Sequence, residues 1–237
     1  LSRGETEGVF QLESSGMKQV LVGLQPQNLE DVIALISLYR PGPMDSIPTY
    51  LRNRHEPDKI SYKTPQLAHI LDVTNGCIVY QEQVMQIFRE LAGFSFGQAD
   101  NVRRAMSKKK HAVMEAEREH FVHGCTDPGN ECPGCVANGI SEKVANEIYD
   151  EMSSFASYAF NKSHAACYAY VAFQTAYLKC HYPSEFMAAL LTSVLDNTGK
   201  VIEYSGECAR LGIKVLPPDI NISGSGFTCL LYTSPSP

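Results

Sequence analysis

The spacing of apolar residues is the feature that most restricts what this sequence can fold into. Leu29, Val32, Ile33 and Ile36 lie at positions i, i+3, i+4 and i+7, and Asn28 just before them is a suitable N-cap. Positions with this spacing fall on one face of a helix, so we predict an amphipathic helix here. Apolar spacing of the same kind predicts helices at 84–91, 99–106 and 141–155. We expect further helices at 160–179, 185–195 and 200–212, and a polar helix at 110–121.

Two short segments, 77–80 and 213–221, are typical of a strand or of a strand and turn, so we predict a mainly α fold with a few short strands. The 237 residues can bury one good core or two, and 44% hydrophobic residues indicate a globular chain. No apolar run approaches the ~18–20 residues that cross a bilayer, so we expect no membrane partner.

The first residue is Leu1, no signal peptide precedes it, and the eight cysteines form no regular framework. We therefore expect an internal fragment of a longer, cytoplasmic protein with reduced thiols.

A dense run of cations stands out against the formal net charge of -6. Five of the eight residues from 103 to 110 are basic, namely Arg103, Arg104, Lys108, Lys109 and Lys110. Paired arginines suit multidentate binding of phosphate oxygens, and lysines suit a nucleic-acid backbone. The commoner role of a generic basic run is a solvated helix face. Phosphate is the expected anion, and a nucleotide and a polynucleotide both remain open.

Two other cationic positions are candidates for the same chemistry. Lys162 and His164 belong to the segment "FNKSH" at an expected helix start, where free N–H groups favour anions. Arg40 precedes a rigid Pro-Gly-Pro turn that can fix its direction. An ordinary polar helix start and a structural salt bridge are the alternatives at these two places.

A metal site and a metal-dependent active site are both weakly supported. Cys125, Cys132 and Cys135 follow His120 and His123, but zinc needs four tetrahedral ligands and no second C-x2-C occurs. We therefore predict no bound metal. The sequence contains no P-loop or G-x-G-x-x-G motif. It also has no D-x-D pair, so the carboxylates that hold Mg²⁺ in phosphoryl transfer are not found here.

Several segments taken together resemble one known family. The segments are "GVFQLESSGM", "ALISLYRPGPM", "IVYQEQVMQI", "RRAMSKKK", "FNKSHAACYAYVAFQTAYLK", "PSEFMAALLT" and "LPPDIN". In this order they resemble the alpha subunits of bacterial DNA polymerase III, the C-family replicative polymerases, and the DnaE branch more than the PolC branch. The resemblance covers nearly all of residues 1–222 and implies most of a helical fingers region, with 124–139 as a variable, cysteine-containing loop. The remainder, 223–237, is a C-terminal tail, and 229–237 breaks all patterning and resembles translated adapter or vector sequence.

The resemblance implies a replicative DNA-directed DNA polymerase, which transfers dNMP from a dNTP to a primer 3′-OH. In that family Mg²⁺ is held by aspartates that precede the segment aligned with residue 1, so this fragment alone is expected to be inactive. The resemblance assigns the incoming triphosphate to Arg103 and Arg104. We place Lys108, Lys162, His164 and Arg40 near the same nucleotide, and Lys109 and Lys110 near the template-primer DNA. Other subunits of the replicative holoenzyme are expected partners. The alternative is a non-catalytic helical module that binds nucleic acid or zinc.

Overall fold

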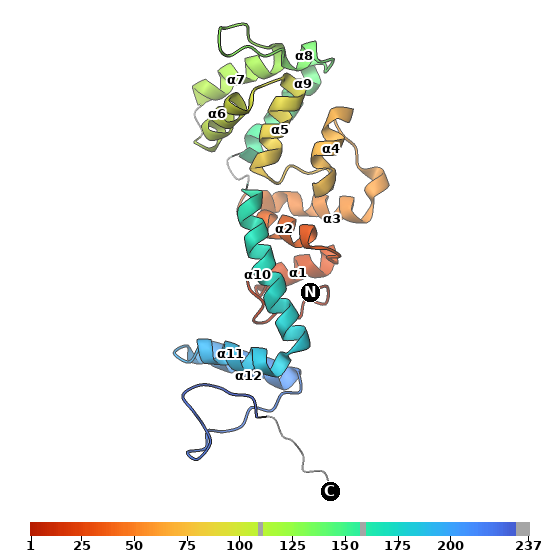
Figure 1. Cartoon of the computed structure of the whole chain (residues 1–237). Coiled ribbons are helices and arrows are strands. Elements are labelled where there is room, and N and C mark those ends of the chain that lie inside the picture. Colours follow the sequence, from red (N-terminus) through yellow and green to blue (C-terminus); the bar gives the residue numbers. More distant parts are fainter. Residues whose placement is uncertain (109–110, 157–159, 231–237) are drawn as a thin grey trace. The chain divides into compact units, whose positions relative to one another are not determined.

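The computed structural model describes residues 1–108, 111–156 and 160–230. Within these residues it has twelve α-helices, four short 3-10 helices and no strand, which confirms a mainly α fold (Figure 1). The only β pairing among them is two isolated bridges, a parallel one between Tyr80 and Phe160 and an antiparallel one between Cys125 and Cys132. No helix of the described part is long and apolar enough to cross a membrane.

The α-helices in chain order are α1 (Ser15–Leu24), α2 (Leu29–Leu38), α3 (Ile47–His55), α4 (Ala68–Leu71), α5 (Gln81–Ala92), α6 (Phe96–Ser107), α7 (His111–His123), α8 (Gly134–Ala137), α9 (Glu142–Ala156), α10 (Lys162–His181), α11 (Pro183–Ser193) and α12 (Thr198–Arg210). The 3-10 helices are η1 (Pro43–Ser46), η2 (Pro57–Lys59), η3 (Pro65–Leu67) and η4 (Asp72–Thr74).

The chain divides into two compact units. Unit 1 comprises Leu1–Gln25 and Tyr168–Pro237, and unit 2 comprises Pro26–Cys167. In unit 1 the pair α11 and α12 buries Met187, Leu191 and Tyr204 between them. The helices that carry the predicted cationic residues belong to unit 2. Of α10, only the first turns, up to Cys167, lie in this unit.

The core of unit 2 is an aromatic cluster that fixes α5, α7 and α9 against one another. The ring of Phe88 lies 5.0 Å from that of Phe121 and 6.0 Å from that of Tyr149, centroid to centroid. All three side chains are fully buried, and Val102 and Met106 of α6 belong to the same core. Buried aromatic pairs at such distances stabilise a core beyond the area they remove from water. The packing therefore positions α6, on which the arginine pair lies.

Capping residues set the limits of several helices, as the sequence predicts for Asn28. The side chain of Asn28 accepts from Asp31 N at the start of α2. Gly93 ends α5 in the left-handed region at φ 74°, which favours glycine. Two residues later Ser95 opens α6 with a capping box, in which Ser95 Oγ accepts from Gln98 N and Gln98 Oε1 accepts from Ser95 N. The short turn between Gly93 and Ser95 thus joins α5 to α6.

The two strand predictions are wrong, and the reason is visible at 77–80. The N–H groups of Val79 and Tyr80 donate to Gln83 Oε1 at 2.8 and 2.9 Å, so a side chain takes the place of a neighbouring strand. Residues 213–221 contain no strand, and Asp219 begins a turn there.

Smaller differences concern the helix starts, the cysteine loop and the tail. Helix α11 begins at Pro183, before the predicted start at 185, and α12 begins at Thr198, before the predicted start at 200, with Asn197 as its N-cap. The predicted loop at 124–139 contains α8 and the bridge between two cysteines. Of the segment predicted to be non-native, 229–237, residues 231–237 lie outside the described residues.

Candidate phosphate-binding site

The two arginines of the basic run are organised by one carboxylate on the same helix. Asp100 Oδ1 accepts from Arg103 Nε at 2.9 Å and from Arg103 Nη2 at 2.7 Å, while Asp100 Oδ2 lies 2.7 Å from Arg104 Nε. The spacing i, i+3 and i+4 makes this possible, since these positions are neighbours on a helix surface. The hydrogen bonds from Arg103, together with the nearby charge of Arg104, lower the pKa of Asp100. Asp100 therefore stays ionised and orients both guanidinium groups.

The two guanidinium groups differ in exposure. Arg103 is 20% exposed and also donates from Nη1 to Gln81 Oε1 at 3.0 Å, so it is held between α6 and the start of α5. Arg104 is 65% exposed. Arg104 is therefore the arginine that a ligand in solvent can reach with the least rearrangement.

The start of α5 also contacts the segment that leads into α10. Gln81 N donates to Phe160 O at 3.0 Å, and Tyr80 forms its parallel bridge with the same residue. Gln81 thus contacts Arg103 through its side chain and Phe160 through its backbone. This residue brings together two of the predicted sites, the arginine pair and the "FNKSH" segment.

Three of the other predicted residues, Arg40, Lys162 and His164, gather around two aromatic rings at this junction. The Arg40 guanidinium lies 3.7 Å from the centre of the Phe160 ring, and the ring of His164 meets that of Phe160 edge-on at 5.3 Å. Lys162 Nζ lies 5.2 Å from the centre of the Tyr80 ring. A cation over an aromatic face at these distances is attracted by the ring. Arg40, Lys162 and His164 therefore belong to one cluster, to which Arg103 is joined through Gln81.

Two backbone amides at the start of α10 already have side-chain partners within the chain. Glu82 accepts from Lys162 N at 3.2 Å and from Asn161 Nδ2 at 3.0 Å. Asn161 Oδ1 in turn accepts from His164 N at 2.9 Å and caps the helix. A carboxylate of the chain thus occupies part of the position that the sequence assigned to phosphate.

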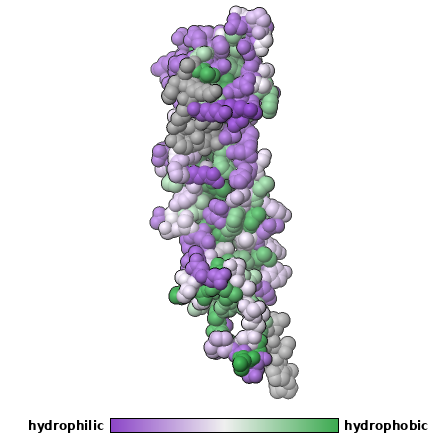
Figure 2. Space-filling view, turned by 90° about the vertical axis from the view of Figure 1, so that its left-hand side faces the viewer, coloured by the Kyte–Doolittle hydropathy of each residue, from purple (hydrophilic) through white to green (hydrophobic). Residues whose placement is uncertain are grey.

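Carboxylates are interspersed among the cations of the site. Lys162 Nζ pairs with Glu30 Oε2 at 2.9 Å, as the arginine pair does with Asp100. Arg40 and the exposed Lys108 have no ion pair with the described residues. Hydrophilic side chains predominate in the upper part of Figure 2, at the level of α6 and α7 in Figure 1. Lys109 and Lys110, predicted to contact DNA, lie outside the described residues.

Sequence reasoning missed the residues that hold the cations in place. Asp100 carries a usable signal, because it stands three and four positions before the two arginines. Gln81, Glu30 and Glu82 carry none, since each reaches a residue far away in the chain.

The cysteines of the 124–139 loop are buried thiols. Burial raises the pKa of Cys132, and it raises the pKa of Cys135 to about 12. A raised pKa disfavours the thiolate, the form that binds zinc. No group of three or more His, Cys, Asp or Glu side chains in the described residues is arranged to hold a metal ion. The absence of zinc remains a prediction.

Comparison with known proteins identifies the family. Residues 1–129 match the family model of the bacterial DNA polymerase III alpha subunit finger domain. The DNA polymerase III subunit alpha of Thermus aquaticus is 51% identical over 232 residues, which are 96% of this chain and 18% of that protein. Those of Bacillus subtilis and Pasteurella multocida are each 47% identical, over 96% and 98% of this chain. The chain spans about a fifth of the length of these relatives. It therefore belongs to the bacterial DNA polymerase III alpha subunit family, and its residues 1–129 to the finger domain of that family.

Proposed function

We propose that this chain contributes the fingers of a replicative DNA-directed DNA polymerase and binds the triphosphate of the incoming dNTP. The observation that carries the proposal is the pair Arg103 and Arg104, both oriented by Asp100, with Arg104 largely exposed. Family membership supports the reaction class. Template-primer DNA, other holoenzyme subunits and a cytoplasmic location belong to the same proposal.

The carboxylates near the arginines do not fit a Mg²⁺ site. Asp100 and Glu30 are each paired with a cation, and Glu82 caps the start of α10. The described residues hold no cluster of candidate metal ligands, and the whole sequence has no D-x-D pair. We assign the Mg²⁺ of the polymerase reaction to carboxylates outside this sequence and derive no step through the metal here.

The role left to this chain is to hold and neutralise the triphosphate. The primer 3′-OH attacks the α-phosphorus, and negative charge accumulates on the leaving pyrophosphate. A guanidinium that meets this charge stabilises the transition state more than the ground state. Arg104 has the exposure for direct contact, Arg103 is held beside it by Asp100 and Gln81, and Lys108 lies one turn further on.

Replacement of Arg104 in the full-length polymerase tests the proposal. Arg104→Ala is expected to raise the dNTP KM and to lower kcat. A charge-assisted contact contributes about 1.5–3 kcal/mol, so kcat/KM should fall roughly tenfold to a hundredfold. Arg104→Lys should restore only part, because an ammonium cannot make the planar bidentate contact.

Arg89→Ala is the matched control, since Arg89 is an exposed arginine near the other end of α5 from Gln81. It should leave both constants unchanged. Template-primer affinity, measured separately, should change little with Arg104→Ala, because DNA contacts are spread over many cations. Unchanged dNTP kinetics beside a large loss of DNA affinity would show that the cluster binds a different anion.

A further inference from the structure

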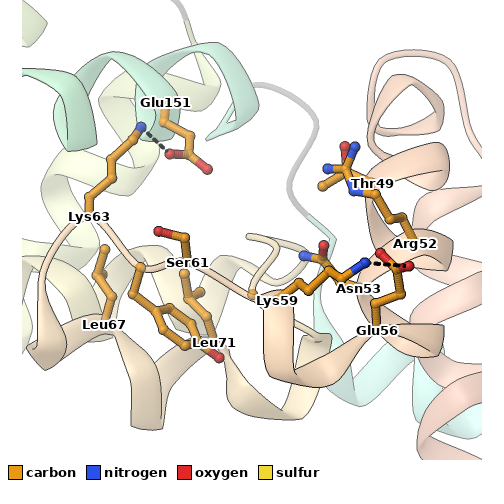
Figure 3. A pocket seen from close by; sticks show the side chains of 12 residues that line it. Thr49, Arg52, Asn53, Glu56, Lys59, Ser61, Lys63, Leu67, Leu71 and Glu151 are labelled. Carbon is orange, nitrogen blue, oxygen red and sulfur yellow. Dashed lines mark hydrogen bonds and ion pairs between the residues drawn. The ribbon is translucent and has the colours of Figure 1, made fainter.

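Unit 2 contains a polar cavity whose residues take no part in the proposed triphosphate site. Its volume is about 440 Å³, within the range of pockets that hold small molecules. It is lined by residues of α3, of the segment 56–63 and of α9 (Figure 3). Arg52 and Thr49 lie on one side of it, and Ser61, Leu67 and Leu71 lie on another.

Among the described residues, one cation of this cavity has no hydrogen-bond or ion-pair partner for its side chain. Lys59 pairs with Glu56 at 2.9 Å, and Lys63 pairs with Glu151 at 2.5 Å. The Arg52 guanidinium makes no hydrogen bond or ion pair with the described residues, which sets it apart from both lysines. Two paired lysines and one unpaired arginine give the cavity a net positive charge, so it favours an anion.

The remaining lining supplies neutral donors and an apolar wall. Thr49, Ser61 and Tyr62 line the cavity, and their hydroxyl groups have no hydrogen-bond partner among the described residues. Leu67 and Leu71 are buried at 4% exposure and present aliphatic surface. An arginine with hydroxyl donors suits phosphate oxygens, and an apolar wall suits a flat ring.

We propose that this cavity binds a nucleoside monophosphate, with the phosphate at Arg52 and the base toward Leu67 and Leu71. The volume holds more than a phosphate ion, and Arg52 lies across the cavity from Leu67 and Leu71 (Figure 3). The site is distinct from the arginine pair on α6, whose residues do not line it. The inference does not depend on the proposed polymerase function.

The test is equilibrium binding of dAMP to the purified 237-residue chain, measured by calorimetry. We expect saturable binding of one dAMP at this site, and inorganic phosphate should compete only weakly because it lacks the base. Arg52→Gln should weaken dAMP binding about tenfold or more, since it removes a charge-assisted contact. Because Arg52 is exposed, helix content should stay unchanged in this variant.

A gain of affinity provides the sharper test. Glu151→Gln removes the carboxylate that pairs with Lys63, so the cavity gains a net positive charge and the dAMP anion should bind several-fold more tightly. Damage to the fold cannot produce that result. Arg104→Ala should leave dAMP binding unchanged, which separates this site from the triphosphate site. Absence of saturable dAMP binding, or binding lost in Arg104→Ala and kept in Arg52→Gln, would overturn the proposal.

Discussion

The most informative stability experiment concerns a buried ion pair in unit 1. Lys179 on α10 and Glu207 on α12 are only 7% and 4% exposed, and Lys179 Nζ lies 2.6 Å from Glu207 Oε1. The ammonium also donates to the carbonyl oxygens of Glu7 at 2.8 Å and Glu5 at 3.3 Å. Arg210 donates twice to the same Glu207 carboxylate, at 2.7 and 2.6 Å. The network ties the N-terminal segment, α10 and α12 together.

The two halves of the pair should respond unequally to removal. Glu207→Leu leaves the Lys179 ammonium buried with only two carbonyl partners, and breaking a buried pair in this way costs about 3–5 kcal/mol of unfolding free energy. Lys179→Met leaves Glu207 with both hydrogen bonds from Arg210, so the loss is mainly two unpaired carbonyls, about 1–3 kcal/mol. The double variant removes both buried charges and should be more stable than Glu207→Leu alone.

Urea denaturation of the chain, followed by circular dichroism and by tyrosine fluorescence, measures these differences. Coincidence of the two transitions is needed first, because two units can unfold separately. Lys143→Met is the control: this lysine is 86% exposed, and its loss should change stability by no more than about 0.5 kcal/mol. Two results would contradict this description of a buried, coupled pair. One is a Glu207→Leu variant as stable as the control, and the other is a double variant whose loss of unfolding free energy equals the sum of the two single losses.

Two further predictions concern catalysis and pH. The purified chain should not extend a primer with dNTPs and Mg²⁺, because its sequence has no D-x-D pair; template-dependent incorporation by a clean preparation would contradict this. Burial alone would raise the pKa of Glu207, but hydrogen bonds from Arg210 and Lys179 outweigh it and lower the pKa below its ordinary 4.5. The stability from this group is therefore present above pH 4.5 and lost as the pH falls below it, so the urea midpoint should drop toward pH 3, and drop less in Glu207→Gln.

Local signals in the sequence predicted most of the helices, because their causes are local. Apolar spacing and the cap at Asn28 act within a few residues and were confirmed. The strand predicted at 77–80 does not form, because its backbone groups bond to other partners. These partners are the side chain of Gln83 and the backbone of Phe160, which is far along the chain. Apolar β-branched residues favour a strand only when another strand is available to pair with them.

The candidate site was predicted as a set of cations, and the structure adds the carboxylates that order them. An arginine side chain has about 2 kcal/mol of rotamer entropy to lose when a ligand fixes it. Asp100 already restricts Arg103 and Arg104, so less of that cost falls on the binding step.

The same carboxylates also compete with any incoming phosphate. Asp100 is ionised at neutral pH, and it lies within 3 Å of both guanidinium groups that a triphosphate would contact. Under the proposed function, a single phosphate would have to overcome this repulsion with few contacts, whereas a triphosphate would bring several charges to Arg104 and Lys108 at once. We therefore expect the interspersed charge to favour polyanions over inorganic phosphate. We propose that the arrangement of acidic residues selects the ligand, and the count of basic residues in the sequence does not reveal this arrangement.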